Sequence, residues 1–473
     1  MMDWIVTPAR LGGALALVLG YVGLCSGVAW RLRQQRQALL RERLSLQQAG
    51  AADGADGAAV LVVYASQTGQ AEALARDTAR TLHAGGCPVQ LLPVQELTLA
   101  QLQASAHSLW LLSTTGEGDA PDQALLFVQQ LLVQQLPQSA ALQGHTAQVL
   151  ALGDREYAQF CAFGLRVQAW LQAQGAQTQV VCMDSGQVQA HARALADWQT
   201  RVGDLLQTVT GQAAAGWQSA DSQQRWVLRR RTHLNPGSQG GAVYLLEWEP
   251  EHGALPQWES GDLVSLCPPG EPDTPRDYTI ASVPADGCLQ LLVRHSVRDD
   301  GEPGVASHWL CEDMPLGTAL PLRLRAHSGF RLESNMERPV VLIGNGTGLA
   351  GLYSHIKARV QQQQFDHWLL FGERSPQHDK LLDVQLQQWV EQGQLARLDR
   401  AWSRDVAQPG YVQQLLAQQA DALRHWVERG AAIYVCGSLQ GMAKGVDDML
   451  REILGSEQLL ALAASGRYRR DVY

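Results

Sequence analysis

The sequence has few of the patterns that build metal sites or disulfide frameworks. Its eight cysteines lie far apart with no C-x-x-C pair, which disfavours a zinc ribbon, a cysteine-ligated iron–sulfur cluster and a disulfide scaffold. No H-x-x-x-H spacing indicates a metal site, and no G-x-S-x-G motif supports a hydrolase. Lys and Arg number 37 against 46 Asp and Glu, and the net charge of −9 argues against a nucleic-acid partner. We therefore expect a protein of a reduced compartment, with no metal site.

The composition favours several ordinary globular domains. Hydrophobic residues make up 46% of the 473-residue chain and charged residues 18%, which supplies enough apolar material for packed cores. At roughly 100–200 residues per domain, a chain of this length corresponds to about two to four domains.

One long apolar run lies near the amino terminus. Residues 11–30 carry no charge, and a helix rising about 1.5 Å per residue would let them cross the ~30 Å hydrocarbon core of a bilayer. The arginines that follow are Arg31, Arg33, Arg36, Arg41 and Arg43. By the positive-inside rule, the sequence predicts a single transmembrane helix in the cell inner membrane, with the later domains in the cytoplasm. A cleaved signal peptide is the alternative, and residues 31–50 and 51–59 are expected to form a juxtamembrane helix and a tether.

Residues 60–204 alternate short apolar runs with helical patterns. The runs with the composition of buried parallel strands are 60–66, 88–94, 108–114, 146–154 and 178–184. This alternation predicts an α/β doubly wound sheet, in which a ligand lies beyond the carboxyl ends of the strands. The loops after the first, third and fourth runs are therefore the candidate ligand site.

These three loops carry residue types that hold a phosphate and a flat ring. The first offers hydroxyls, amides and a helix N-terminus for a phosphate monoester, with a simple helix cap as the alternative. The second has glycines that admit close approach to a ring, and the third has two aromatic side chains that would serve as stacking faces or as core. The candidate residues are Ser66, Gln67, Thr68, Gly69 and Gln70 in the first loop, Ser113, Thr114, Thr115, Gly116 and Gly118 in the second, and Leu152, Gly153, Asp154, Tyr157, Phe160 and Cys161 in the third.

The pattern changes after a linker at residues 205–224. Residues 225–337 contain six runs typical of antiparallel strands, which fit a small β-barrel. An arginine within it would clamp a diphosphate, a tyrosine would lie on a flat ring, and the amides opening a short helix would bind pyrophosphate. An ordinary strand arginine and a helix cap are the alternative. The candidate residues of the barrel are Arg276, Tyr278, Thr279, Gly304, Val305, Ala306 and Ser307.

Residues 338–473 return to alternating strands and helices. A strand runs into a glycine-containing turn that opens a helix, which is the context that a dinucleotide diphosphate requires. The candidate residues of this turn are Gly346, Thr347 and Gly348. The chain ends in residues 466–473, for which a frayed terminus is the alternative to a functional role.

Taken in this order, the motifs resemble those of the diflavin reductases, in which a flavodoxin-like FMN domain is fused to a ferredoxin–NADP reductase-like module for FAD and NADPH. The third loop, LGDREYAQFC, is most similar to the sulfite reductase flavoprotein alpha subunit within that family. The resemblance implies that the first loop holds the FMN phosphate and that the other two flank its isoalloxazine ring. It implies further that the barrel holds FAD and that the last domain holds NADPH.

The resemblance also implies roles for residues late in the chain. The adenosine 2′-phosphate of NADPH would be held by Ser403, Arg404, Tyr411 and Gln413. Pro409 stands where the family pattern has a lysine, and Glu373 is an acid of the kind that favours a free 2′-hydroxyl, so strictness for NADPH over NADH stays open. The catalytic residues implied by the resemblance are Thr279, Cys436, Asp471 and Tyr473, the last stacked on the flavin.

The sequence thus predicts a membrane-anchored oxidoreductase that passes electrons from NADPH to FAD, to FMN and to an external one-electron acceptor. Candidate acceptors are a haem protein, a ferric siderophore system and the sulfite reductase haemoprotein. Glu117, Asp119 and Asp122 surround the second loop and indicate a partner with a basic docking face. The alternative function is a non-catalytic, membrane-tethered flavin-binding redox sensor.

Overall fold

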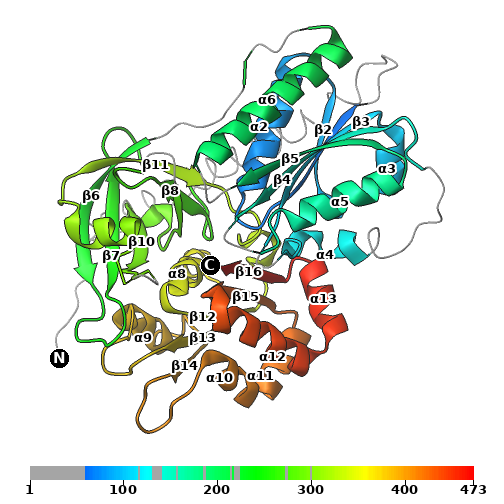
Figure 1. Cartoon of the computed structure of the whole chain (residues 1–473). Helices are drawn as coiled ribbons and strands as arrows, with labels where there is room; N and C mark the ends of the chain where they lie inside the picture. Colours follow the sequence, from blue (N-terminus) through cyan, green and yellow to red (C-terminus); the bar gives the residue numbers. More distant parts are fainter. Residues whose placement is uncertain are drawn as a thin grey trace, which may run out of the picture.

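Three β-sheets, each with its own buried core, make up the described part of the chain (Figure 1). The computed structural model describes residues 59–115, 118–129, 141–155, 158–184, 188–212, 216–217, 224–271, 275–298 and 301–473. The domain boundaries expected from the sequence, 60–204, 225–337 and 338–473, stay a prediction, and the sheets are described here one by one.

The first sheet is parallel, with the strand order β2-β1-β3-β4-β5. In that order its strands are β2 (Val89–Pro93), β1 (Val60–Ala65), β3 (His107–Ser113), β4 (Thr146–Gly153) and β5 (Gln177–Asp184). The helices that pack on one face are α2 (Gln70–Ala84) and α6 (Val188–Thr210), and those on the other are α3 (Leu99–Ala104), α4 (Leu125–Phe127) and α5 (Ala162–Ala173). This is the flavodoxin-type doubly wound order, which confirms the α/β fold predicted for this region.

The second sheet is antiparallel and has six strands. Its order is β10 (Leu289–Arg294), β7 (Val243–Pro250), β6 (Gln224–His233), β11 (Ala319–Arg325), β8 (Leu263–Leu266) and β9 (Arg276–Thr279). The two end strands approach each other where Ile280 forms an antiparallel bridge to Leu291, so the sheet curls back on itself. A short helix, α7 (Val305–His308), follows β10. The interior is filled by apolar side chains that include Trp226 and Trp248, which are both fully buried.

The third sheet is parallel, and its last strand is formed by the carboxyl terminus. Its order is β14 (Arg397–Trp402), β13 (His367–Glu373), β12 (Val340–Asn345), β15 (Ala432–Gly437) and β16 (Tyr468–Val472). One face is covered by α8 (Leu349–Gln361) and α9 (Asp383–Glu391), the other by α10 (Val412–Gln418), α11 (Ala420–Glu428), α12 (Lys444–Leu454) and α13 (Ser456–Ala464). The sequence did not predict β16. A frayed terminus is excluded, because residues 468–472 pair with β15 along their whole length.

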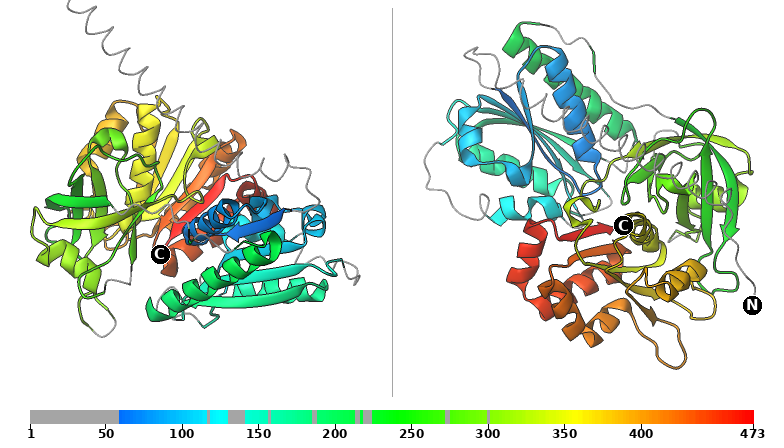
Figure 2. Two further views of the ribbon diagram at one scale, coloured as in Figure 1. Left: turned by 90° about the horizontal axis from the view of Figure 1, so that it is seen from above. Right: turned by 180° about the vertical axis from the view of Figure 1, so that it is seen from behind.

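The three sheets meet around the carboxyl terminus. In Figure 1 and in both views of Figure 2, the end of the chain lies between the first sheet, the antiparallel sheet and the third sheet. Helix α13 contacts α4 of the first domain, so β16 and α13 together bring the third sheet against the first. This arrangement places the carboxyl ends of β1, β12 and β15 near one another.

The predicted fold class is wrong in one part, the transmembrane helix. Among the residues that the structure describes, none of the helices is both long and apolar enough to cross a bilayer. The apolar run at residues 11–30, the juxtamembrane segment 31–50 and nearly all of the tether lie outside the described residues. The corrected fold class is the flavodoxin-like sheet, the antiparallel flavin-type sheet and the nucleotide-type α/β sheet. The inner-membrane location, which rested on that helix alone, is corrected with it.

The closest approach of helix to sheet in the first domain provides a test of its packing. A Cβ atom added at Gly164 of α5 would lie 2.4 Å from the Cβ of Ala151 on β4. We expect Gly164→Ala to force α5 away from the sheet and to lower the free energy of unfolding by about 1–3 kcal/mol, seen as a lower thermal midpoint of this domain. Ala169→Ser, at an exposed position of the same helix, is the control and should leave the midpoint unchanged. Equal midpoints for the two variants would contradict the close packing.

Candidate functional site

A cavity of about 900 Å³ lies where the antiparallel sheet meets the third sheet. Its volume is within the range of pockets that hold cofactors. The predicted residues that line it are Thr68, Tyr278, Thr279, Ser307, Gly346, Thr347, Ser403, Tyr411, Gln413, Asp471 and Tyr473. Of the residues predicted in the second half of the chain, those that do not line it are Arg276, Gly304, Val305, Ala306, Gly348, Arg404 and Cys436. The fold thus gathers residues more than two hundred positions apart around one space.

Thr279, Cys436 and Asp471 form a buried cluster at one wall of the cavity. Cys436 and Asp471 are direct partners in the parallel pairing of β15 with β16, so their side chains share a face of the sheet. The Thr279 hydroxyl donates to Asp471 Oδ2 at 2.7 Å, and Cys436 Sγ lies 3.6 Å from the same oxygen. Burial, with the neighbouring Asp471 carboxylate, holds the pKa of the Cys436 thiol well above its usual value. Cys436 is therefore a neutral donor to Asp471, not a nucleophile.

Tyr473 lies beside this cluster at the mouth of the cavity. Its hydroxyl is 3.0 Å from Thr347 Oγ1, and its backbone amide donates to the Gly437 carbonyl at 3.1 Å. The residue is 57% exposed, so one side of it faces solvent while the other covers the space above Asp471. An aromatic side chain in this place can move aside without disturbing the core.

The glycine turn after β12 has the close backbone approach expected of a dinucleotide site. A Cβ at Gly348 would lie 2.2 Å from the Cys436 carbonyl oxygen, so only glycine fits between the turn and β15. Gly346 has a φ of +56° and lies beside the ion pair of Arg294 with Glu373. The turn therefore opens α8 with its backbone facing the cavity, as phosphate binding requires.

Two other predicted diphosphate ligands are placed less favourably. Arg276 is drawn to Glu271, with its guanidinium 3.3 Å from that carboxylate, and its side chain is 42% exposed. The Ser307 hydroxyl accepts from the Ser296 amide at 3.1 Å and lies 2.7 Å from the Ser296 hydroxyl. Ser307 lines the cavity but Arg276 does not, so the role of Arg276 stays a prediction.

The region predicted for the 2′-phosphate contains a cation that the sequence reasoning missed. Ser403, Tyr411 and Gln413 line the cavity, whereas Arg404 is exposed outside it. Arg374, which follows β13 directly, lines the cavity in its place. Its position beside the predicted acid Glu373 is the signal that would have found it.

Glu373 does not present a free carboxylate to the cavity. It is paired with Arg294, and its second oxygen accepts from the Arg374 backbone amide at 3.0 Å. Burial raises the pKa of Glu373 above its ordinary value, against the opposing effect of Arg294. The pairing removes the electrostatic objection to a phosphate that Glu373 raised in the sequence.

The first loop of the flavodoxin-like domain fits a phosphate ligand. Ser66 Oγ is buried and has no hydrogen-bond partner among the described residues, and Thr115 Oγ1 in the second loop is in the same state. A buried hydroxyl without a partner is costly, so each is in place for a ligand to satisfy. Gly69 has a φ of +78° and precedes α2, so the loop turns where Gln67, Thr68 and Gln70 surround it.

The other two loops are described only in part. Gly116 and Tyr157 lie outside the described residues, so the predicted stacking on Tyr157 stays a prediction. Thr114 Oγ1 accepts from the Phe163 amide at 3.3 Å, and the Arg155 guanidinium lies 4.6 Å from the ring centre of Phe160. Of the remaining predicted residues, Ser113 is the last of β3, Leu152 and Gly153 are the last two of β4, and Gly118, Asp154 and Cys161 lie in the segments that follow these strands.

The phosphate loop is held against the antiparallel sheet by contacts that the sequence did not reveal. Arg325 donates to the Thr68 carbonyl at 2.9 Å and is also paired with Asp277 of β9. His327 Nε2 donates to the Gln67 carbonyl at 2.6 Å. The R-D-Y-T strand of the barrel is thereby linked to the first loop of the other domain through a single arginine.

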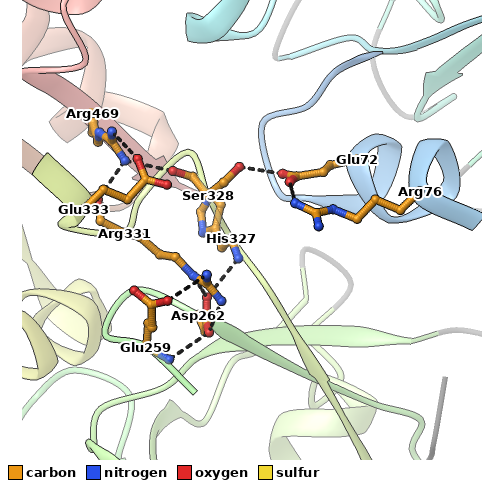
Figure 3. A network of polar contacts seen from close by, with 9 residues as sticks. All are labelled: Glu72, Arg76, Glu259, Asp262, His327, Ser328, Arg331, Glu333 and Arg469. Atoms are coloured by element: carbon orange, nitrogen blue, oxygen red, sulfur yellow. Dashed lines mark hydrogen bonds and ion pairs between the residues drawn. The ribbon is translucent and has the colours of Figure 1, made fainter. Parts of the chain in front are cut away.

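A polar network extends this contact (Figure 3). Glu72 on α2 accepts from Arg76 of its own helix at 2.5 Å and from the Ser328 hydroxyl across the interface. Arg331 lies behind Ser328 and is paired with Asp262 at 2.6 Å. Burial alone would lower the pKa of Arg331, but the carboxylates of Asp262, Glu259 and Glu72 together raise it above its ordinary value. None of these residues lies in a recognised motif, so only the fold identifies them.

The comparisons with known proteins agree with this arrangement. Residues 62–208 match the flavodoxin family, and residues 342–448 match the oxidoreductase NAD-binding domain. The sulfite reductase [NADPH] flavoprotein alpha-component of Yersinia enterocolitica is 37% identical over 233 residues, which cover 45% of this chain and 37% of that protein. The protein of the same name from Vibrio cholerae is 27% identical, and its match covers 95% of this chain and 92% of its own length.

The chain is similar to the diflavin reductases along nearly its whole length. Its flavodoxin domain is the FMN domain, and the second half is the FAD and NADPH module. The chain spans little more than a third of the length of the Yersinia relatives that it matches, 37% in each case. The family prediction made from the ordered motifs is confirmed, as are its three cofactors, whereas the roles of single residues stay predictions.

The contact between the two halves of the chain depends on a partly buried ion pair. Arg470 of β16 is paired with Asp122, and the Gln67 side chain donates to the Arg470 carbonyl at 3.2 Å. We expect Asp122→Asn to loosen this contact, because Arg470 would keep only its longer ion pair with Asp447 of its own domain, at 3.8 Å. Amide hydrogen exchange of residues 66–69 and 325–328 should accelerate roughly tenfold or more.

Asp197→Asn is the matched control for this prediction. Asp197 also pairs with an arginine, but the pair lies on the exposed surface of α6, where such contacts contribute little. Exchange at both segments should stay at the wild-type rate in this variant. Unchanged exchange in Asp122→Asn would show that the ion pair does not hold the two halves together.

Proposed function

We propose that this chain is an NADPH-dependent flavoprotein oxidoreductase that passes electrons from NADPH through FAD and FMN to an external one-electron acceptor. The observation that carries the proposal is the single cavity lined by the predicted flavin residues Tyr278 and Thr279, the predicted nucleotide residues Ser403 and Gln413, and Thr68 of the FMN loop. A hydride donor and two flavins bound around one cavity would be close enough to one another for electron transfer. When bound, FAD can accept a hydride, and FMN can release electrons one at a time.

The chain's own residues prepare the space where the hydride would pass. The Asp471 carboxylate lines the cavity and is fixed by donors from Thr279 and Cys436, so its charge is oriented before any ligand arrives. A fixed negative charge favours the positive charge that develops on a hydride donor. Tyr473 covers this position from the solvent side and would have to swing away before a nicotinamide could enter.

The identity of the acceptor is proposed from charge and from the relatives. The relatives named above are components of sulfite reductases, so the sulfite reductase haemoprotein is one candidate. Another haem protein or a ferric siderophore system is the other. In this structure Asp122 is paired with Arg470 of β16. An acceptor with a basic face would therefore compete with Arg470 for the same acidic residue.

The proposal is tested by mixing the purified holoenzyme with NADPH and following flavin absorbance in a stopped-flow instrument. Bleaching within seconds is expected, and mass spectrometry of the released chromophores should identify both FMN and FAD. Asp471→Asn should retain both flavins but slow bleaching roughly tenfold or more, since it removes a charge placed for the transition state. No bleaching of a preparation that contains both flavins would overturn the proposed activity.

We propose that Arg374 supplies the positive charge for the 2′-phosphate that the family lysine would supply at Pro409. Arg374 lines the cavity beside Ser403, and a guanidinium suits a phosphate dianion. Arg374→Gln should raise the KM for NADPH roughly tenfold or more while leaving kcat and the KM for NADH nearly unchanged. Arg397→Gln is the control, because Arg397 pairs with Asp399 outside the cavity. Equal effects on NADPH and NADH would contradict this role.

A further inference from the structure

Two cysteines lie side by side in the flavodoxin domain. No cofactor site proposed above needs them as a pair. Cys161 caps the start of α5 and is fully buried, whereas Cys182 on β5 is exposed. Cys182 is the register partner of Ala151 on β4, and Cys161 Sγ lies 3.1 Å from the Ala151 carbonyl and 3.9 Å from that of Met183. Because register partners point to the same face of a sheet, the Cys182 side chain lies on the face of Ala151, next to which Cys161 Sγ also lies.

The two thiols have unlike electrostatic environments. The hydrogen bond from Cys161, assisted by the positive charge of Arg155, lowers the pKa of Cys182 below its ordinary value. The same hydrogen bond, together with burial and the negative charge of Asp184, raises the pKa of Cys161. Cys182 is therefore the exposed, thiolate-forming member, and Cys161 is the protonated donor behind it. This is the division of roles expected of a reactive thiol with a resolving partner.

We propose that Cys161 and Cys182 form a peroxide-sensitive dithiol whose oxidation to a disulfide loosens FMN. Among the other described cysteines, Cys87, Cys311 and Cys436 are buried and Cys288 is half-buried, whereas Cys182 is exposed. The inference rests on the contacts of the two residues, and its first step does not require the proposed reductase activity.

The chemistry balances with one hydroperoxide as oxidant. The Cys182 thiolate attacks the terminal peroxide oxygen, the O–O bond breaks, and the leaving oxygen takes a proton to give an alcohol, or water from hydrogen peroxide. Cys161 then attacks the sulfur of the resulting sulfenic acid and loses its proton, and the departing hydroxide takes that proton to form water. Two thiols are oxidised by two electrons in total, and the peroxide is reduced by two.

The bond would act on the FMN site through Gly153. A disulfide requires the two sulfurs to approach to about 2 Å, which draws Cys161 toward β5. A Cβ at Gly153 would already lie 2.6 Å from the Cys161 amide nitrogen, so the start of the third loop is packed tightly against Cys161. Because the two segments touch, movement of Cys161 displaces the loop that flanks the predicted flavin position.

The test treats the purified, flavin-loaded full chain with hydrogen peroxide, blocks free thiols with iodoacetamide, and maps the tryptic peptides. We expect a disulfide between peptides 156–166 and 167–193, reversed by dithiothreitol, with free FMN rising in the filtrate as it forms. In Cys182→Ser, loss of the Cys161 thiol should be at least about tenfold slower, and FMN should stay bound. Cys288→Ser is the matched control and should behave as the wild type.

Each other outcome contradicts the proposal. Peptides that remain unlinked while Cys182 is converted to a sulfinic acid would show that Cys161 does not resolve the oxidised thiol. A disulfide that forms without release of FMN would overturn the coupling to the third loop. Failure of NADPH to bleach the flavins affects neither readout, so this test and that of the reductase activity fail independently.

Discussion

The pairing of β16 with β15 is the contact on which the arrangement of the whole molecule depends. Successive residues of a strand point to opposite faces, and β16 uses both. On one side, Asp471 meets Cys436 and Thr279 in the cavity between barrel and nucleotide sheet. On the other side, Arg470 reaches Asp122 of the FMN domain. One five-residue strand therefore sets the hydride position and the docking of the electron-releasing domain together.

This geometry links two functions that a transfer chain must balance. A short path between the flavins needs a tight contact, whereas delivery to an external acceptor needs the FMN face to be accessible. Beside the packing of α13 on α4, the contact includes ion pairs and hydrogen bonds at Arg325, Ser328 and Arg470. Polar contacts between domains exchange readily with water and weaken with salt. The chemistry of the interface thus permits separation at small cost in free energy.

Much of the fold and part of the site could be predicted from the sequence because their signals are local. Apolar runs separated by helical segments predicted the two parallel sheets. Glycines after strands predicted the turns at Gly69 and Gly348. Gly69 has a positive φ, and a Cβ at Gly348 would lie 2.2 Å from a carbonyl oxygen, so a side chain is excluded at both. The predicted transmembrane helix is corrected by the described residues, in which none of the helices could span a bilayer, and the apolar run itself lies outside them. Arg374, Arg325 and the strand β16 were missed because nothing near them in the sequence distinguishes them.

The sequence by itself determined the order of three domains, the family and the three cofactors, since each motif is a contiguous segment whose composition reflects its own backbone requirements. Only the tertiary structure decided which residues share a space. It placed Thr68 at the same cavity as Ser403, paired Glu373 with Arg294, and drew Arg276 away toward Glu271. It also brought Cys161 beside Cys182. Such pairings are set by the register and packing of strands that are distant in the sequence. The contacts that stabilise them are therefore not visible in any local sequence pattern.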